Sequence, residues 1–153
     1  MAHTYTRILI HMVFATIERS PLIHAELKPS LHAYMAGTVR NLGPHLYALN
    51  GVDDHCHLIL DLPPKLALAD FANQLKASTT KWVKKEHGAD FGWQRGYGAF
   101  SMNQESLSRA VRYVETQEEH HKQTTFRDEL ESFVRLHGME ADPEFIDGEW
   151  KRA

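Results

Sequence analysis

The apolar residues of this chain change their spacing in a fixed order along the sequence. Four segments have the composition or the alternation of strands, and they lie at 4–16, 44–52, 55–62 and 96–102. Three segments repeat their apolar residues at helical spacing, at 25–43, 67–88 and 105–122. The order β-α-β-β-α-β is the ferredoxin-like pattern, which RNA-recognition domains share. We therefore predict an α+β fold: an antiparallel sheet with two helices on one face and an additional C-terminal helix.

Length and composition limit the class of protein. The 153 residues are enough for one domain with a single core. The only cysteine, Cys56, excludes an internal disulfide and is typical of a reducing compartment. The longest apolar run, at 8–17, is too short to span a bilayer and lacks the pattern of a signal peptide. We expect a cytoplasmic protein without a membrane partner.

Charge is unevenly distributed around a net value of −3. Residues 65–112 hold eight basic and four acidic side chains, whereas 115–149 hold eleven acidic and three basic ones. The helix at 67–88 carries Lys76, Lys81 and Lys84, a candidate phosphate-binding surface, with Trp82 available for base stacking. The alternatives are a solvated helix face for the lysines and a core position for Trp82.

A pair of histidines stands at the start of the third strand, in "DDHCHLIL" at 53–60. Side chains alternate along a strand, so His55 and His57 share one face, while Cys56 and the following leucines share the other. The second set is apolar and is expected to face the core helices. The two imidazoles then lie on the opposite, open face, where both can bind one divalent ion. Two histidines alone are a weak metal signal, so a third ligand must come from elsewhere.

The helix at 105–122 offers further polar side chains. Tyr113 and Gln117 are four residues apart and project from one face, which also carries Arg109 and His120. This face lies beside the apolar stripe of the helix. Core packing does not require such a set, although a single helical tyrosine is commonly a half-buried packing residue.

The segments "DDHCHLIL", "GYGAFSMN" and "VRYVETQEEHH" resemble the insertion-sequence transposases of the single-tyrosine HUH class, to which the REP-associated tyrosine transposases are related. The resemblance extends from residue 5 to about 140. It implies a catalytic domain over 1–122. Residues 123–153 are expected to form an acidic, peripheral tail of the same domain, with a short helix near 126–138.

The resemblance also implies roles for individual residues. His55 and His57 match the metal-binding pair, Tyr113 the nucleophile, and Gln117 the third ligand through its amide oxygen, while Asp54 has a supporting position. The implied activity is cutting and rejoining of single-stranded DNA through a 5′-phosphotyrosine intermediate. The implied partners are hairpin ends of an insertion element and a second copy of the chain. Arg109 joins the lysines as a candidate DNA contact.

The implied cofactor is Mg²⁺ or Mn²⁺, the metals of the family, although imidazoles would also accept Zn²⁺. No nucleotide cofactor is expected, because the chain has no Gly-rich phosphate loop. A metal-dependent hydrolase of small molecules is a weaker alternative, because the expected carboxylate cluster is missing.

An RNA-recognition module is the main competing interpretation, since "RGYGAFSM" at 95–102 partly matches its aromatic octapeptide. That motif needs aromatic residues at its third and fifth positions, on the exposed face. Here the third is Tyr97 but the fifth is Ala99, and Phe100 points to the other face. A domesticated transposase that binds DNA without strand transfer is a further alternative.

Overall fold

Four antiparallel strands form one sheet in the order β2-β3-β1-β4. The computed structural model describes residues 3–88 and 90–147. The strands are β1 (Leu9–Ala15), β2 (His45–Gly51), β3 (His55–Asp61) and β4 (Gly98–Met102). Both middle strands, β1 and β3, lie between two neighbours. The order and the antiparallel pairing confirm the predicted ferredoxin-like fold class.

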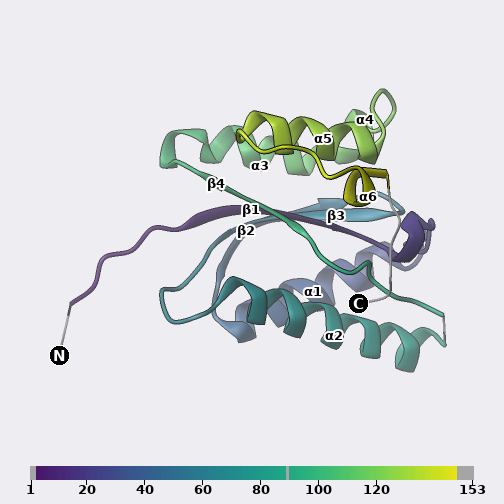
Figure 1. Cartoon of the computed structure of the whole chain (residues 1–153). Helices are drawn as coiled ribbons and strands as arrows, with labels where there is room; N and C mark the ends of the chain where they lie inside the picture. Colours follow the sequence, from purple (N-terminus) through teal and green to yellow (C-terminus); the bar gives the residue numbers. More distant parts are fainter. Residues whose placement is uncertain (1–2, 89, 148–153) are drawn as a thin grey trace.

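Helices cover both faces of this sheet (Figure 1). The helices are α1 (Lys28–Leu42), α2 (Leu68–His87), α3 (Leu107–Glu115), α4 (Gln117–His120), α5 (Phe126–Leu136) and α6 (Pro143–Asp147), with two 3₁₀ turns at Ile17–Arg19 and Gln104–Ser106. Figure 1 shows α1 and α2 on one side and α3, α4, α5 and α6 on the other. The sheet is therefore the middle of three layers.

The main core lies between the sheet and the pair α1 and α2. Cys56, Leu58 and Leu60 of β3 point into it and are fully buried, as the alternation predicted. Burial of a leucine-sized side chain contributes roughly 1.5–3 kcal/mol. Trp82 packs against the edge of this core, with its ring stacked on Tyr34 at 4.8 Å between centroids. Its position confirms the packing interpretation of Trp82.

The opposite face of the sheet is covered as well, so our expectation of an open face beside His55 and His57 is wrong. Helix α5 presents Phe126 and Leu130 toward the sheet, where both are buried together with Val13 of β1. These apolar side chains recur at helical spacing and need a partner surface. The helix in the acidic tail therefore packs on the sheet, and it is not peripheral.

The predicted helix at 105–122 is interrupted at Thr116. This residue has φ −107° and ψ 29°, which ends α3 before α4 begins. Its hydroxyl donates a hydrogen bond to the carbonyl of Arg112, at 2.9 Å. Such local bonding competes with regular helix and bends the chain. After this break, His120 and His121 are directed toward Glu129 and the histidines of the sheet.

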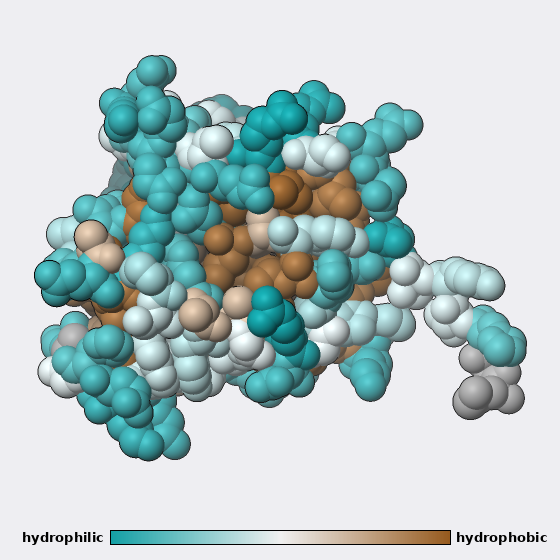
Figure 2. All heavy atoms as spheres, turned by 180° about the vertical axis from the view of Figure 1, so that it is seen from behind, coloured by the Kyte–Doolittle hydropathy of each residue, from teal (hydrophilic) through white to brown (hydrophobic). Residues whose placement is uncertain are grey.

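The outer surface combines hydrophilic margins with apolar residues. Figure 2 shows the rear face, where hydrophobic residues gather in a central band between hydrophilic ones. Within the described residues, no helix has both the length and the apolar character required to cross a membrane.

Candidate metal and nucleophile site

His55 and His57 lie side by side on β3, under the cover of α5. Both side chains are fully buried, with 0% of their surface exposed. The neighbouring strand β1 adds His11, which is also buried. His11 is on the same face because its cross-strand partner is Ile59, two residues from His57. Three imidazoles from two paired strands therefore share one buried face.

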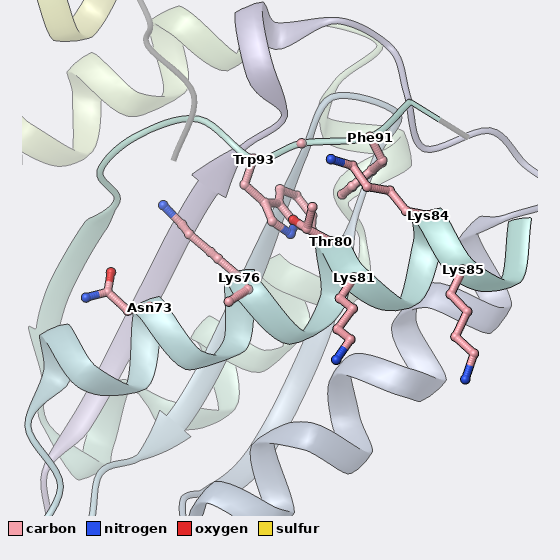
Figure 3. A pocket seen from close by; sticks show the side chains of 10 residues that line it. Asn73, Lys76, Thr80, Lys81, Lys84, Lys85, Phe91 and Trp93 are labelled. Atoms are coloured by element: carbon pink, nitrogen blue, oxygen red, sulfur yellow. The ribbon is translucent and has the colours of Figure 1, made fainter. Parts of the chain in front are cut away.

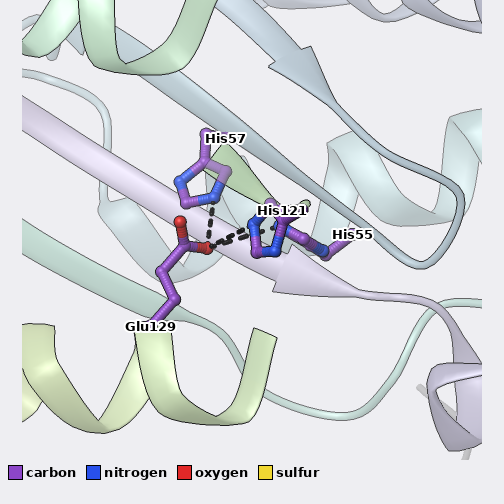
Figure 4. A group of neighbouring side chains, drawn as sticks. All are labelled: His55, His57, His121 and Glu129. Atoms are coloured by element: carbon purple, nitrogen blue, oxygen red, sulfur yellow. Dashed lines mark hydrogen bonds and ion pairs between the residues drawn. The ribbon is translucent and has the colours of Figure 1, made fainter. Parts of the chain in front are cut away.

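Glu129 of α5 lies at the centre of this group (Figure 4). Its Oε1 is 2.8 Å from Nε2 of His57 and 3.3 Å from Nε2 of His55. Oε1 is also 3.2 Å from Nε2 of His121, which follows α4. One potential ligand atom from each of the four residues lies within 4.8 Å of the others. Strand β3, helix α5 and the residue that follows α4 therefore bring together three imidazoles and one carboxylate.

The outer nitrogens of these imidazoles have partners of their own. Nδ1 of His55 donates to Oδ1 of Asp54 at 2.6 Å, and Nδ1 of His121 donates to the carbonyl of Thr124 at 2.7 Å. Nδ1 of His57 is 2.7 Å from Nε2 of His11. Such contacts fix the ring orientation and the tautomer of a metal-binding histidine.

The hydroxyl of Tyr113 reaches the same carboxylate from α3. It donates to Oε2 of Glu129 and lies 3.0 Å from Nε2 of His120. The ring of Tyr113 is half-buried. Burial, together with the negative charge and hydrogen bond of Glu129, raises the pKa of Tyr113 above its usual range. The phenol is therefore held neutral while no cation balances the carboxylate.

Gln117 lies next to this group without facing the histidine pair in its described contacts. Its Nε2 donates to the carbonyl of Tyr113 at 3.3 Å, and its Oε1 is 3.0 Å from Nε2 of His121. The side chain is fully buried. The described contacts of Gln117 therefore connect Tyr113 of α3 with His121.

The pKa shifts follow the balance between burial and the central carboxylate. Burial lowers the pKa of His57 to about 4, against the attraction of Glu129. Burial also lowers the pKa of His55, but the neighbouring carboxylates of Asp54 and Glu129 reverse this, and the net shift of the pKa is upward. Burial would raise the pKa of Glu129, yet the imidazoles of His121, His55 and His57 around it hold this pKa far below its usual range.

The group fits a divalent cation. Nε2 of His55 is buried and has no hydrogen-bond partner within the described residues, although it points at Glu129. A neutral imidazole whose Nδ1 donates outward presents a lone pair at Nε2. Three such nitrogens and a carboxylate oxygen are ordinary ligands for a first-row divalent metal.

A separate basic hollow lies on α2, on the other side of the sheet (Figure 3). This cavity of about 680 Å³ has Phe91 and Trp93 at its floor. Lys81 and Lys84 line it and are exposed, which fits both a phosphate-binding surface and a solvated helix face. Lys76 does not belong to the exposed face, because its side chain is buried and its ammonium donates to the carbonyls of Gln94 and Gly96.

The prediction of Lys76 as a DNA contact is therefore corrected. Its aliphatic stem runs inward from α2, and burial lowers the pKa of its ammonium to about 8. Because the ammonium donates to two backbone carbonyls of the loop before β4, it holds that loop against α2. In contrast to Lys76, Arg109 lies on the exposed side of α3.

Two central residues, His121 and Glu129, were not identified from the sequence. His11, His120 and His121 were likewise not predicted as members of this group, and all three contact it. The sequence carries one usable signal for Glu129. It lies inside the apolar stripe of its helix, between Phe126 and Phe133, where a carboxylate is unexpected.

The sheet face also bears on the RNA-recognition alternative. Such modules stack bases on aromatic side chains of an open sheet. Here Tyr97 and Ala99 pack toward the main core, while Phe100 is buried under α5 and lies in stacked contact with Phe133. Neither set is available as a stacking platform in this structure.

The comparisons with known proteins agree on one family. The family described as "Transposase IS200 like" matches residues 4–117. Two transposases for insertion sequence element IS200, from Salmonella typhimurium and Salmonella typhi, are each 24% identical over 105 residues. Each alignment covers 63% of this chain and 68% of the relative.

Two solved structures share the fold. One is described as a transposase from Deinococcus radiodurans, with a TM-score of 0.58, 22% identity, and coverage of 76% of this chain and 96% of that one. The other is a REP-associated tyrosine transposase bound to a REP hairpin, with a TM-score of 0.60, 17% identity, and coverage of 93% and 91%. The family match ends at residue 117, so His121 and Glu129 lie beyond it.

Proposed function

This chain belongs to the IS200-like transposase family, and on that premise we propose that it cuts and rejoins single-stranded DNA through Tyr113. The observation that carries the proposal is the convergence of the Tyr113 hydroxyl, the His55 and His57 pair and one carboxylate on a single buried point. Such a phenol beside a metal-binding group is the arrangement that nucleophilic attack on a phosphodiester requires.

The chemical step exchanges one phosphodiester for another. Oη of Tyr113 attacks the phosphorus and forms an O–P bond, while the bond from phosphorus to the 3′ oxygen of the DNA breaks. The phenolic proton leaves Tyr113 and the 3′ oxygen gains one, so the products are a 5′-phosphotyrosine and a 3′-hydroxyl. A second 3′-hydroxyl reverses the step and joins the strands. The exchange needs no nucleotide cofactor, because phosphodiester energy is retained in the intermediate.

His55 and His57 would hold a divalent ion, with Mg²⁺ or Mn²⁺ as the expected metals. When bound, such an ion supplies positive charge that stabilises the developing charge on the phosphate and the leaving oxygen. Asp54 orients His55 through the hydrogen bond at Nδ1. Gln117 lies beside His121, with its amide oxygen 3.0 Å from Nε2 of that ring.

Access of DNA to this site requires movement of α5. The two β3 imidazoles are fully buried beneath it, and Tyr113 is half-buried. A hollow of about 390 Å³ beside the site is lined by Asp54, His121 and Lys122. His121 and Asp54 therefore border this hollow as well as the histidine group. We propose that the DNA phosphate enters here as α5 shifts away from the sheet.

The proposed DNA partner is a single strand with a hairpin, of the kind that the REP-associated relative binds. Lys81, Lys84 and Arg109 are exposed and available for phosphate contacts. A homodimer is the proposed assembly, as in the family that the sequence resembles.

The test is trapping of a covalent adduct. Labelled single-stranded DNA from the flanks of its own gene is incubated with the full chain and Mn²⁺, then separated on a denaturing gel. We expect a DNA–protein adduct that disappears with Tyr113→Phe and with a chelator. Tyr5→Phe, at a fully exposed tyrosine, is the matched control and should leave the adduct unchanged. DNA binding without any adduct would contradict the proposal and favour a domesticated binding protein.

A further inference from the structure

We infer that His121 and Glu129 complete the metal site, so that the ion is held by three imidazoles and one carboxylate. The inference rests on the proposed function only for the presence of a metal. Both residues lie beyond the segment that matches the family. They come from the end of α4 and from α5, and Figure 4 shows both directed at the histidine pair. In this donor set, His121 and Glu129 take the place of Gln117, which the family resemblance implied as the third ligand.

The hydrogen-bond directions around His55 and His121 carry the argument. The Nδ1 atoms of these rings face oxygens that accept hydrogen bonds, namely the carboxylate of Asp54 and the carbonyl of Thr124. The N–H of each neutral ring is therefore committed to the outer side. The inner atom, Nε2, then carries a lone pair on both rings.

These inner lone pairs point at another acceptor. Oε1 of Glu129 lies 3.3 Å from Nε2 of His55 and 3.2 Å from Nε2 of His121. Lone pairs that face a carboxylate in a buried site repel it unless positive charge lies between them. A divalent cation bound by all of these atoms provides that charge. The outer contacts then form the carboxylate–histidine and carbonyl–histidine pairs that commonly support metal-binding imidazoles.

His57 can adopt the same arrangement. Its Nδ1 is 2.7 Å from Nε2 of His11, and a neutral imidazole can either donate or accept at that position. When His57 donates from Nδ1 to His11, its Nε2 becomes a third inward lone pair. His11 is buried, and its contact with Nδ1 orients the ring of His57.

The two oxygens of Glu129 connect the metal to the nucleophile. Oε1 faces the three imidazoles, whereas Oε2 accepts the hydrogen bond of the Tyr113 hydroxyl. A carboxylate bound to the ion through Oε1 would keep Oε2 on the phenol. In the DNA-free chain Glu129 is therefore also a positioning residue for Tyr113, and α5 contributes directly to the site.

The donor set predicts a metal preference. Mg²⁺ favours oxygen ligands and retains water, whereas Zn²⁺ and Mn²⁺ accept imidazole nitrogen. Three nitrogens and one oxygen should bind Zn²⁺ most tightly, then Mn²⁺, with Mg²⁺ weakest. With only His55, His57 and the Gln117 oxygen as ligands, this preference would be smaller.

Metal titration of the full chain without DNA tests the inference. Metal-stripped protein is titrated with Zn²⁺ and with Mn²⁺ by calorimetry, so the readout does not depend on strand cleavage. We expect His121→Ala and Glu129→Gln each to weaken binding at least about tenfold. Matched controls are His45→Ala and Glu115→Gln, at exposed positions, which should leave binding unchanged. Gln117→Ala should have a smaller effect than either ligand variant.

A measurement on the unaltered chain covers the case in which a variant fails to fold. Zinc should shift the ¹⁵N resonances of Nε2 in His55, His57 and His121, and leave Nδ1 of His121 protonated. Unmoved His121 resonances would overturn the inference, as would ligand variants that bind like the controls while Gln117→Ala abolishes binding. The adduct assay reports separately on the proposed function, because it requires Tyr113 and any bound metal but no particular third ligand.

Discussion

The hydroxyl of Tyr113 on one helix donates a hydrogen bond to the carboxylate of Glu129 on another. Tyr113 lies on α3, within the segment that matches the IS200-like transposases, whereas Glu129 lies on α5, beyond it. The second oxygen of the carboxylate faces the histidines of β3. Tyr113, the proposed nucleophile, and the candidate metal ligands are therefore connected through one side chain that lies outside the family segment.

Removal of this carboxylate should destabilise the metal-free chain. Glu129→Ala deletes the shared partner of Tyr113 and His57, which are left with unsatisfied polar atoms under α5. We expect a loss of about 1–3 kcal/mol in the free energy of unfolding, measured by urea denaturation with a chelator present. Glu115→Ala, at an exposed site on α3, is the control. Equal stability of the two variants would show that the buried contacts contribute nothing.

The metal-free chain should lose stability in acid. Burial lowers the pKa of His11 to about 3 and that of His57 to about 4, against about 6.5 in an unfolded chain. Between pH 6.5 and 4 these histidines bind protons in the unfolded state but not in the folded state. The free energy of unfolding therefore falls as the pH falls. We expect these two rings together to lower it by about 5 kcal/mol between pH 7 and pH 4.5. Urea denaturation at both pH values measures it, and a flat profile would contradict the neutral, buried assignment of these rings.

The exposed lysines of α2 should control the salt dependence of DNA binding. Lys81→Ala combined with Lys84→Ala is expected to weaken single-strand binding and to reduce the slope of log K against log salt by about 1.4. Fluorescence anisotropy over a salt series provides the slope. Lys76→Ala should leave the slope unchanged and lower the melting temperature, because its ammonium is bonded to the backbone carbonyls of Gln94 and Gly96. A reversed pattern would place Lys76 on the DNA surface after all.

Cys56 should be inert to thiol reagents in the folded chain. Its side chain is fully buried in the main core, and burial raises the pKa of the thiol. The thiolate is the reactive form, so neither access nor ionisation favours modification. We expect the thiol reaction with an aromatic disulfide reagent to proceed only at the rate of unfolding and to become fast in urea. Rapid reaction in native buffer would contradict the burial of β3.

Binding of DNA should loosen α5. Because the imidazoles are fully buried under this helix, phosphate access requires its displacement. Amide hydrogen exchange across Phe126–Leu136 is therefore expected to accelerate when hairpin DNA is added, while exchange in α2 stays unchanged. Tyr113→Phe protein is suitable for this experiment because it should not form the adduct. Protection of α5 on DNA binding would show that the phosphate enters by another route.

Part of this arrangement is local and was predictable. The alternation in "HCHLILDL" placed Cys56 and Leu58 toward the main core and both histidines on the other face, as the structure confirms. The order of strand and helix periods likewise predicted the antiparallel sheet. These features follow from side-chain direction and spacing within single elements, which the sequence records directly.

The sequence by itself determined the fold class, the strand faces and the spacing from Tyr113 to Gln117, since each depends on residues close in the chain. Only the tertiary structure decided that α5 closes over the sheet, that Lys76 is buried, and that Glu129 meets His55 and His57 from more than seventy residues away. The physical reason is that an apolar helix face requires a surface to bury against, but its period does not specify which one. Once α5 packs on the sheet, its single buried carboxylate must find partners, and the histidines of β3 provide them.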